Sequence, residues 1–316
     1  MNKSDMYFAS YRNLEDEFLS LTKFIHCDND QLFVYSTAIA ELIIKCSIEI
    51  EAISKILYIE LGGNTSSPKK SRFDDVYLHY INKKIAISKK KILISSPYVY
   101  LDENSRIISP LQNAYTSGQG KGCLWKDAYQ ALKHDLYGNL KKYGNLSNLI
   151  GALGALFILN LYLRNKKYDL IDIKYFDERV ESNLFSVFTY RADNITIQQK
   201  EKTYEVIITP PKNVNKEECI YVIKLTDDNF RSLYNSFLLD NRLILENVKS
   251  SPEIVQFLDN NPTYNITNVV SLITDSLGKD GLKKYIQLPH FSKQLLVKER
   301  EAVLNVNCDI YPSLSD

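Results

Sequence analysis

The sequence predicts an α+β protein, with an all-α helical bundle in its N-terminal half and an antiparallel β-meander plus short helices in its C-terminal half. Apolar residues recur at every third or fourth position up to about residue 166, which is the period of amphipathic helices. From residue 167 they alternate in short runs that turn-forming residues separate. The 316 residues are also enough for two domains. We therefore expect a helical domain at 1–166 and a β-rich α+β domain at 167–316.

The first half is expected to contain five helices. A glycine pair at 62–63 marks the end of the second one, because glycine accepts the left-handed conformation of a helix C-terminus. The predicted helices lie at 5–25, 30–61, 72–90, 124–137 and 147–165, with extended or loop structure at 91–122 and a loop over 138–147.

The last of these helices is apolar over residues 149–163, with Asn160 as the only interruption. This run is shorter than the roughly 20 residues that cross a bilayer, so it predicts a buried core helix without membrane insertion. Two aromatic residues of the preceding helix are expected to pack beside it. The side chains predicted to be buried are Leu149, Leu153, Leu156, Phe157, Leu161, Trp125 and Tyr129.

In the second half, β-branched and aromatic residues predict five strands, followed by helices that begin with the capping pair Thr226-Asp227. The strands are expected at 168–176, 184–191, 194–199, 203–209 and 219–225, and the helices at 226–238, 252–259, 267–277 and 280–286.

Composition excludes several classes of site. The five cysteines are scattered without a CxxC pair and the chain has four histidines, so we expect no metal site. Nucleotide-binding glycine motifs, HExxH and GxSxG are absent, so no cofactor is expected. The chain begins with a mixed polar segment where a secretory signal would carry an apolar one, which predicts a cytoplasmic protein.

Charge is unevenly distributed, although the net charge is only +1. Residues 1–65 carry five basic and ten acidic side chains, whereas 66–166 carry sixteen basic and six acidic ones. Such a basic region attracts phosphates, which makes Lys69, Lys70 and Lys126 candidate RNA contacts. The alternative is a solvated face that the acidic first helices balance.

The most informative stretch is WKDAYQALKHD at 125–135. On a helix, Trp125 and Tyr129 share a packing face, while Asp127 and His134 share a polar one, since seven residues make nearly two turns. A histidine has a pKa suited to a general base, and the adjacent Lys133 supplies a cation for a phosphate. The alternative for His134 is a structural hydrogen bond, for instance to a glutamate of the second helix.

This stretch, followed by a loop and the apolar helix NLSNLIGALGALFILNLY at 145–162, resembles a broad group of bacterial HEPN-like proteins. The second-helix run CSIEIE at 46–51, with Lys55, resembles its partner segment, so the resemblance covers about residues 5–165. It implies a dimeric helical bundle, and in many members a metal-independent ribonuclease of toxin–antitoxin, abortive-infection or phage-defence systems. The family's usual arginine four to six residues before the catalytic histidine is missing before His134, and Leu136 stands where the group often has a basic residue.

The resemblance and the residues together give a set of expectations. The expected catalytic residues are His134, Lys133, Asp127 and Glu51, with Arg72 and His79 as a secondary pair that has the family's spacing. The expected function is a HEPN-like ribonuclease of a toxin or anti-phage defence system. The alternative is a non-catalytic dimerisation or interaction module whose C-terminal half senses a ligand or binds a partner. The expected partners are RNA, a second copy of the chain, and an antitoxin or defence-system protein.

Overall fold

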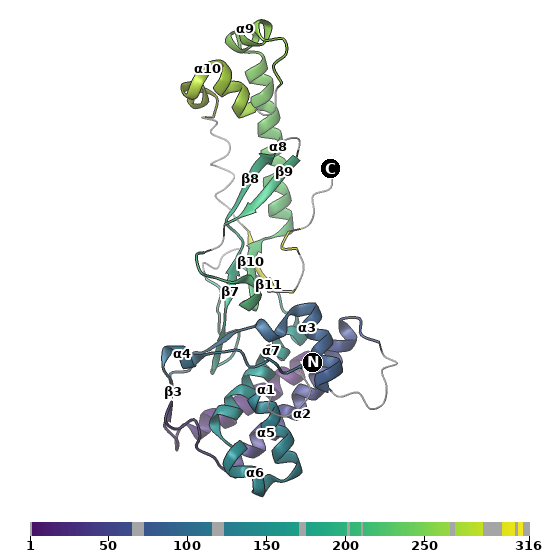
Figure 1. The fold of residues 1–316 in the computed structure, drawn as a ribbon, viewed down its shortest axis with the longest axis vertical. Coiled ribbons are helices and arrows are strands. Elements are labelled where there is room, and N and C mark those ends of the chain that lie inside the picture. The colour runs from purple at the N-terminus through teal and green to yellow at the C-terminus, as the bar shows by residue number, and fades with distance from the viewer. Residues whose placement is uncertain are drawn as a thin grey trace.

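A computed structural model describes residues 2–64, 73–115, 123–170, 175–200, 203–209, 211–265, 269–286, 299–306 and 309–311. The molecule is elongated, with a helical bundle at one end, small sheets in the middle and a projecting arm at the other end (Figure 1). This mixed α and β architecture agrees with the predicted α+β class. Its helical part precedes most of its strands in the chain, as the change of periodicity near residue 167 indicates.

The bundle is built around helix α7 (Leu146–Arg164), which contacts α1 (Lys3–Leu21), α2 (Thr37–Glu60) and α5 (Leu124–His134). Because α7 is apolar on all sides, it is stable in water only when neighbouring elements surround it. It is the one helix among the described residues that is long and apolar enough to cross a membrane, and 89% of that apolar window is buried inside the molecule. All seven side chains predicted to be buried are at most 2% exposed.

Several helix boundaries differ from the prediction because side chains cap the helices. The Ser36 hydroxyl accepts a hydrogen bond from the Ile39 N–H at 3.2 Å, so α2 begins at Thr37 and not near residue 30. Similarly, the Asp135 carboxylate accepts from the Gly138 N–H at 2.9 Å, which ends the expected helix 124–137 early and starts a separate helix, α6 (Leu136–Tyr143), that runs into the expected loop over 138–147.

The expected third helix is a composite. It consists of a π-helix, a short α-helix and a 3₁₀ turn: η1 (Phe73–Leu78), α3 (His79–Ile85) and η2 (Ile87–Lys89). The break falls at Ala86, which has a left-handed backbone with φ of 57°.

The predicted antiparallel meander is wrong, although most of the predicted strand positions hold strands. β6 (Phe185–Val187) pairs with β2 (Ile92–Ile94) of the helical half, which also pairs with β4 (Ile107–Ile108). The next strand, β7 (Thr189–Arg191), runs parallel to β10 (Tyr221–Leu225). The consecutive strands β6 and β7 therefore belong to different sheets, each paired with a strand from elsewhere in the chain.

The remaining strands complete this arrangement. β10 pairs with a strand near the C-terminus that sequence analysis did not predict, and β8 and β9 form a separate antiparallel hairpin. The strand order of the four-stranded sheet is β5-β11-β10-β7. The bounds not yet given are β1 (Cys27–Asp28), β3 (Val99–Tyr100), α4 (Glu103–Arg106), β5 (Tyr168–Asp169), β8 (Ile195–Lys200), β9 (Thr203–Ile208), η3 (Lys216–Glu218) and β11 (Arg300–Leu304).

The expected boundary at residue 166 does not separate two cores. One hydrophobic core contains the inner faces of the bundle helices together with Leu184, Phe185, Tyr221 and Leu304 from the second half. Backbone hydrogen bonds also join the two halves, because β6 of the second half pairs with β2 and extends the β2–β4 sheet of the first half. The two halves therefore pack as one body around α7.

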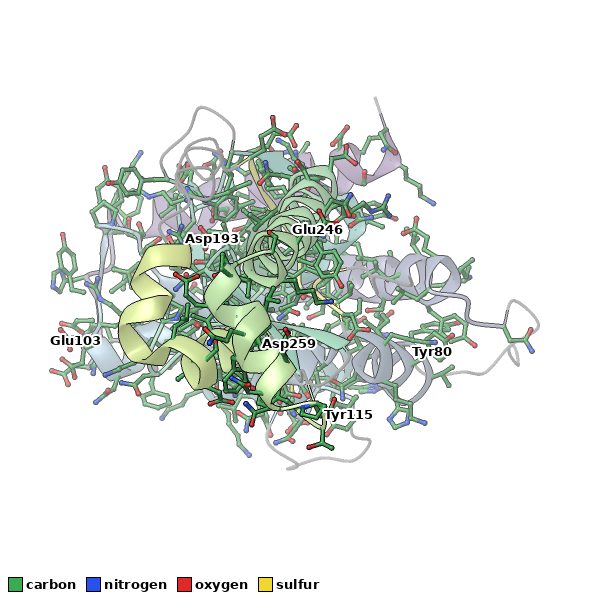
Figure 2. The ribbon with its side chains drawn as sticks, turned by 90° about the horizontal axis from the view of Figure 1, so that it is seen from above. Tyr80, Glu103, Tyr115, Asp193, Glu246 and Asp259 are labelled. Carbon is green, nitrogen blue, oxygen red and sulfur yellow. The ribbon has the colours of Figure 1, made fainter. Side chains whose placement is uncertain are left out.

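The arm extends beyond this body. It contains α8 (Asp227–Lys249), α9 (Pro252–Asn260) and α10 (Val269–Ile286), and α10 is broken at Gly278, where the backbone φ is 69°. A small core of its own holds the tip, formed by Val248, Ile254, Leu272 and Ile273. Seen from above, the labelled arm residues Glu246 and Asp259 project over the middle of the molecule, whereas Tyr80, Glu103 and Tyr115 lie toward its periphery (Figure 2).

Candidate functional site

Helix α5 carries the residues expected to do chemistry, and its inner face is fixed as the sequence indicates. Trp125 and Tyr129 are each 2% exposed, and the Trp125 Nε1–H donates to the Pro110 carbonyl at 2.7 Å. The helix ends at His134, because the next residue has an extended backbone. The C-terminal turn of α5 is therefore held in place by aromatic packing while its last two residues face solvent.

Lys133, Tyr129 and Glu51 come together where α5 meets α2. The Lys133 ammonium lies 3.3 Å from the Tyr129 hydroxyl and 5.2 Å from the centre of its ring. Burial raises the pKa of Tyr129, and the nearby Glu51 carboxylate raises it further, whereas Lys133 lowers it. The pKa of Lys133 is in turn raised, first by its hydrogen bond with Tyr129 and also by the charge of Glu51. Lys133 is thus held as a cation at a defined position.

His134 adjoins this cluster in the sequence and is exposed. Among the described residues, its side chain has no hydrogen-bond or ion-pair partner. The structural hydrogen bond to a glutamate of the second helix is not formed either: Glu49 of α2 accepts from the Ser10 hydroxyl, and Glu51 of α2 lies near Tyr129. The imidazole is therefore accessible to solvent.

Asp127 does not join His134, although both lie on one side of α5. Seven residues of α-helix span about 10 Å along the axis, so the two side chains are separated by that rise. Asp127 lies in the first turn of α5, where a negative charge stabilises the helix dipole. The structure therefore brings together two of the four expected catalytic residues, Lys133 and Glu51, leaves His134 beside them, and places Asp127 at the other end of the helix.

The structure describes only one of the three expected RNA contacts, Lys126, and only one residue of the secondary catalytic pair, His79. Lys126 is only 4% exposed, and its ammonium donates to the Ala114 carbonyl at 3.1 Å, so the expected RNA contact by this residue is not supported. Its position on the inner side of α5, near the packed aromatic face, explains the burial. His79 is exposed, with its ring 6.0 Å from that of Tyr115. Lys69, Lys70 and Arg72 lie outside the described residues.

Other polar groups are arranged more tightly than any of these, and sequence analysis missed them. The Glu15 carboxylate is fully buried and accepts hydrogen bonds from Tyr11, Ser182 and the N–H groups of Asn183 and Leu184. The signal in the sequence was a carboxylate inside the apolar stripe of α1, four residues after Tyr11. This cluster fastens α1 to the second half of the chain and has a structural role.

A second buried group is Lys90, which is 2% exposed and donates to the Cys219 carbonyl at 3.0 Å. Burial lowers the pKa of its ammonium to about 8. Within the described part of the chain, no cluster of three His, Cys, Asp or Glu side chains is arranged to hold a metal ion.

Comparison with known proteins adds no relative. No protein-family model, no curated protein and no solved structure matches this chain.

Proposed function

We propose that this chain is a HEPN-like, metal-independent ribonuclease of a bacterial toxin or anti-phage defence system, with its site at the C-terminal end of α5. The observation that supports this most directly is the fixed cation Lys133 next to the accessible imidazole of His134. The Lys133 ammonium donates one hydrogen bond to the Tyr129 hydroxyl, and its remaining N–H groups can bind a phosphate. A second support is that the apolar helix α7 follows α5 in the chain, the two segments on which the resemblance mainly rests.

The proposed reaction is attack by a ribose 2′-oxygen on the adjacent phosphorus. The His134 imidazole takes the proton from the 2′-hydroxyl, the new O–P bond forms, and the bond from phosphorus to the 5′-oxygen breaks. The products are a 2′,3′-cyclic phosphate and a 5′-hydroxyl, which takes up a proton. Lys133 stabilises the negative charge that develops on the phosphate oxygens. Tyr129 and Glu51 position Lys133 and do not touch the reacting atoms.

The test compares two exposed histidines. His134→Ala is expected to slow RNA cleavage by roughly 100-fold or more, the usual contribution of a general base, whereas His26→Ala serves as the control. His26 is suitable because its side chain is 65% exposed and lies on a different element, where it stacks on Tyr100. Cleavage is measured on labelled RNA in the presence of a chelator, with thermal melting of each variant.

The outcomes separate this function from its alternative. The proposal is supported if His134→Ala slows RNA cleavage and His26→Ala does not, if the products carry 2′,3′-cyclic phosphate ends, and if both variants melt like wild type. A wild-type protein that leaves RNA intact, or equal cleavage by both variants, rules out His134 as the base. In the cell, the same His134→Ala change is expected to relieve growth arrest on expression.

The projecting arm favours a second candidate, a non-catalytic interaction module (Figure 1). The tip of the arm has a hydrophobic core separate from the main one, so the arm could bind a partner without a change in the bundle. That partner is a second copy of the chain or an antitoxin or defence-system protein. The Thr226 N–H donates to the Glu299 carbonyl at 3.0 Å, so the two ends of the arm lie side by side and a short turn can replace 227–298.

This arm deletion distinguishes the two candidates. If the chain acts only through partners, the deletion abolishes cellular activity and His134→Ala leaves it unchanged. If the chain is a ribonuclease, the deletion protein still cleaves RNA in vitro, because the main contacts of α5 in the described structure are with α2, α6 and α7 and not with the arm helices. Light scattering on both proteins shows in addition whether self-association requires the arm.

A further inference from the structure

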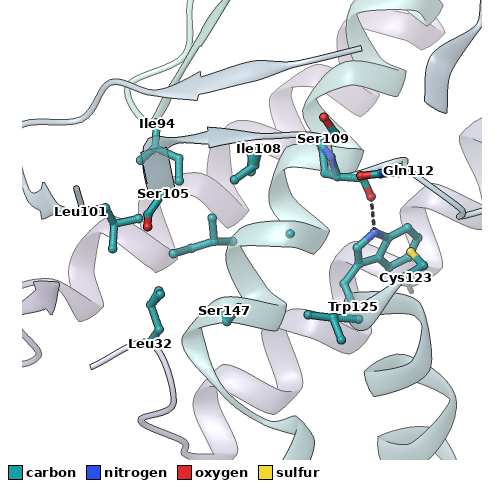
Figure 3. Close-up of a pocket in the computed structure, with 14 residues that line it drawn as sticks. Leu32, Ile94, Leu101, Ser105, Ile108, Ser109, Gln112, Cys123, Trp125 and Ser147 are labelled. Atoms are coloured by element: carbon teal, nitrogen blue, oxygen red, sulfur yellow. Dashed lines mark hydrogen bonds between the residues drawn. The ribbon is translucent and has the colours of Figure 1, made fainter. Parts of the chain in front are cut away.

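A cavity of about 200 Å³ lies between the segment 101–112 and the N-terminal ends of α5 and α7 (Figure 3). The indole of Trp125 forms one wall, and the hydrogen bond from its Nε1–H to the Pro110 carbonyl fixes the ring in that orientation. Gly151 of α7 lies against this ring, and the lack of a side chain there leaves space. Leu32, Ile108 and Ile150 supply apolar surface on the other sides.

The polar groups at the cavity are few and neutral. Ser109, Gln112 and Ser147 line it, and within the described structure their side chains have no hydrogen-bond partner. None of the described lining residues carries a charge. A mostly apolar cavity with a few unpaired polar groups is the usual composition of a site for a small organic molecule. A charged ligand would lose its hydration there without gaining an opposite charge.

We infer that this cavity binds one small, neutral, planar ring molecule that carries a hydrogen-bonding group. The size fits, since engineered apolar cavities of about 150 Å³ bind benzene. The ring lies against the flat indole of Trp125, and its polar substituent forms a hydrogen bond with the Ser109 hydroxyl or the Gln112 amide, which lie on the same side of the cavity. This inference does not depend on ribonuclease activity, because none of the lining residues belongs to the Lys133–His134 site.

The experiment uses the intrinsic fluorescence of the full-length protein. Trp125 is the only tryptophan in the chain, so emission excited at the red edge of protein absorption reports directly on the cavity wall. The probes are benzyl alcohol, the anion benzoate and the cation benzylammonium, which share one ring and differ in charge. We expect a saturable change with benzyl alcohol and binding at least about tenfold weaker for both ions, a difference of about 1.4 kcal/mol.

Variants then test whether the change comes from this cavity. Ser109→Leu fills it and is expected to abolish the response, whereas Ser20→Leu is the matched control on the exposed side of α1. Gly151→Ala adds a methyl carbon 3.4 Å from the Trp125 Cδ1, a contact that the fold tolerates, and is expected to weaken binding several-fold. Gly151→Ala decides the question if Ser109→Leu does not fold.

The inference is overturned if benzyl alcohol gives no saturable change, if the two ions bind as tightly as the alcohol, or if the filled or narrowed variant responds like wild type. Loss of RNA cleavage in His134→Ala has no bearing on these results. The two proposals can therefore fail separately.

Discussion

Replacing Glu15 by Gln is expected to destabilise the protein strongly, although the two side chains have almost the same shape. The carboxylate of Glu15 has no solvent exposure. Its Oε1 accepts from the Tyr11 hydroxyl at 2.7 Å and the Leu184 N–H at 3.1 Å, and its Oε2 accepts from the Asn183 N–H at 3.1 Å. The Arg12 Nε lies 3.4 Å from Oε2 and partly balances the charge.

The magnitude follows from these contacts. A glutamine presents one NH₂ group in place of an acceptor oxygen, and this group faces the N–H and guanidinium donors around it. Hydrogen bonds to a charged group contribute roughly 1.5–3 kcal/mol each, and at least two are lost or become repulsive. Breaking a buried charged network by changing one partner usually costs about 3–5 kcal/mol, which we take as the expected loss in the free energy of unfolding.

Glu17 provides the control on the same helix. Its carboxylate pairs with the Lys45 ammonium at 3.0 Å, and both side chains are about half exposed, so Glu17→Gln is expected to cost under about 1 kcal/mol. Urea unfolding followed by circular dichroism and by Trp125 fluorescence measures both variants. Hydrogen exchange at the Asn183 and Leu184 amides shows in addition whether protection is lost locally. A cost for Glu15→Gln below 1 kcal/mol, or equal to that of Glu17→Gln, would refute this account.

Three further changes test other parts of the structure. Burial lowers the pKa of Lys90 from 10.5 to about 8, so the folded state binds this proton less tightly than the unfolded state. The protonated group therefore destabilises the folded state below pH 8, and the lost stability returns as the pH rises toward 10.5. Wild type should therefore gain roughly 2–3 kcal/mol relative to Lys90→Met between pH 7 and pH 10.5 in urea titrations, and a pH-independent difference would contradict this. Asn145→Ala removes the N-cap of α7, because the Asn145 side-chain oxygen accepts a hydrogen bond from the Asn148 N–H at 3.0 Å. This change should cost about 1 kcal/mol of stability in thermal melting, whereas Lys141→Ala on the exposed surface should cost much less. Gly154→Val should cost roughly 1–3 kcal/mol, since even a Cβ there lies 2.9 Å from a β2 side chain, whereas Gly151→Ala should melt near wild type.

The local pattern of the sequence determined the bundle helices and their inner faces. The apolar run that became α7 could only be stable if surrounded, and its expected core residues are all buried. The strand positions at 185–191, 195–208 and 221–225 also followed from local alternation. Helix ends were less predictable, because one or two hydrogen bonds decide whether a residue such as Asp135 continues one helix or caps the next.

The candidate site was only partly predictable, for a geometric reason. Helical spacing placed Lys133 and His134 correctly at the end of α5 and Asp127 on the same polar face, but the rise of the helix separates Asp127 from His134 by about 10 Å, too far for the two to act on one phosphate. The spacing within α5 also brings Lys133 to Tyr129, four residues earlier, but the approach of Glu51 to this pair requires α2 to cross α5 at one position, which the spacing within either helix does not specify. The burial of Lys126 depends in the same way on the nearby Ala114 carbonyl.

By itself, the sequence determined which residues are apolar, where periodicity changes, and that the first half folds as helices around 146–164. Only the tertiary structure decided which strands pair, since β6 joins β2 across some ninety residues and β7 runs parallel to β10. It also decided that Glu15 is buried, that one core crosses residue 166, and that a cavity remains beside Trp125. The physical reason is that helix formation depends on contacts within a few residues, whereas strand pairing, burial of a charge and cavity shape depend on groups far apart in the chain.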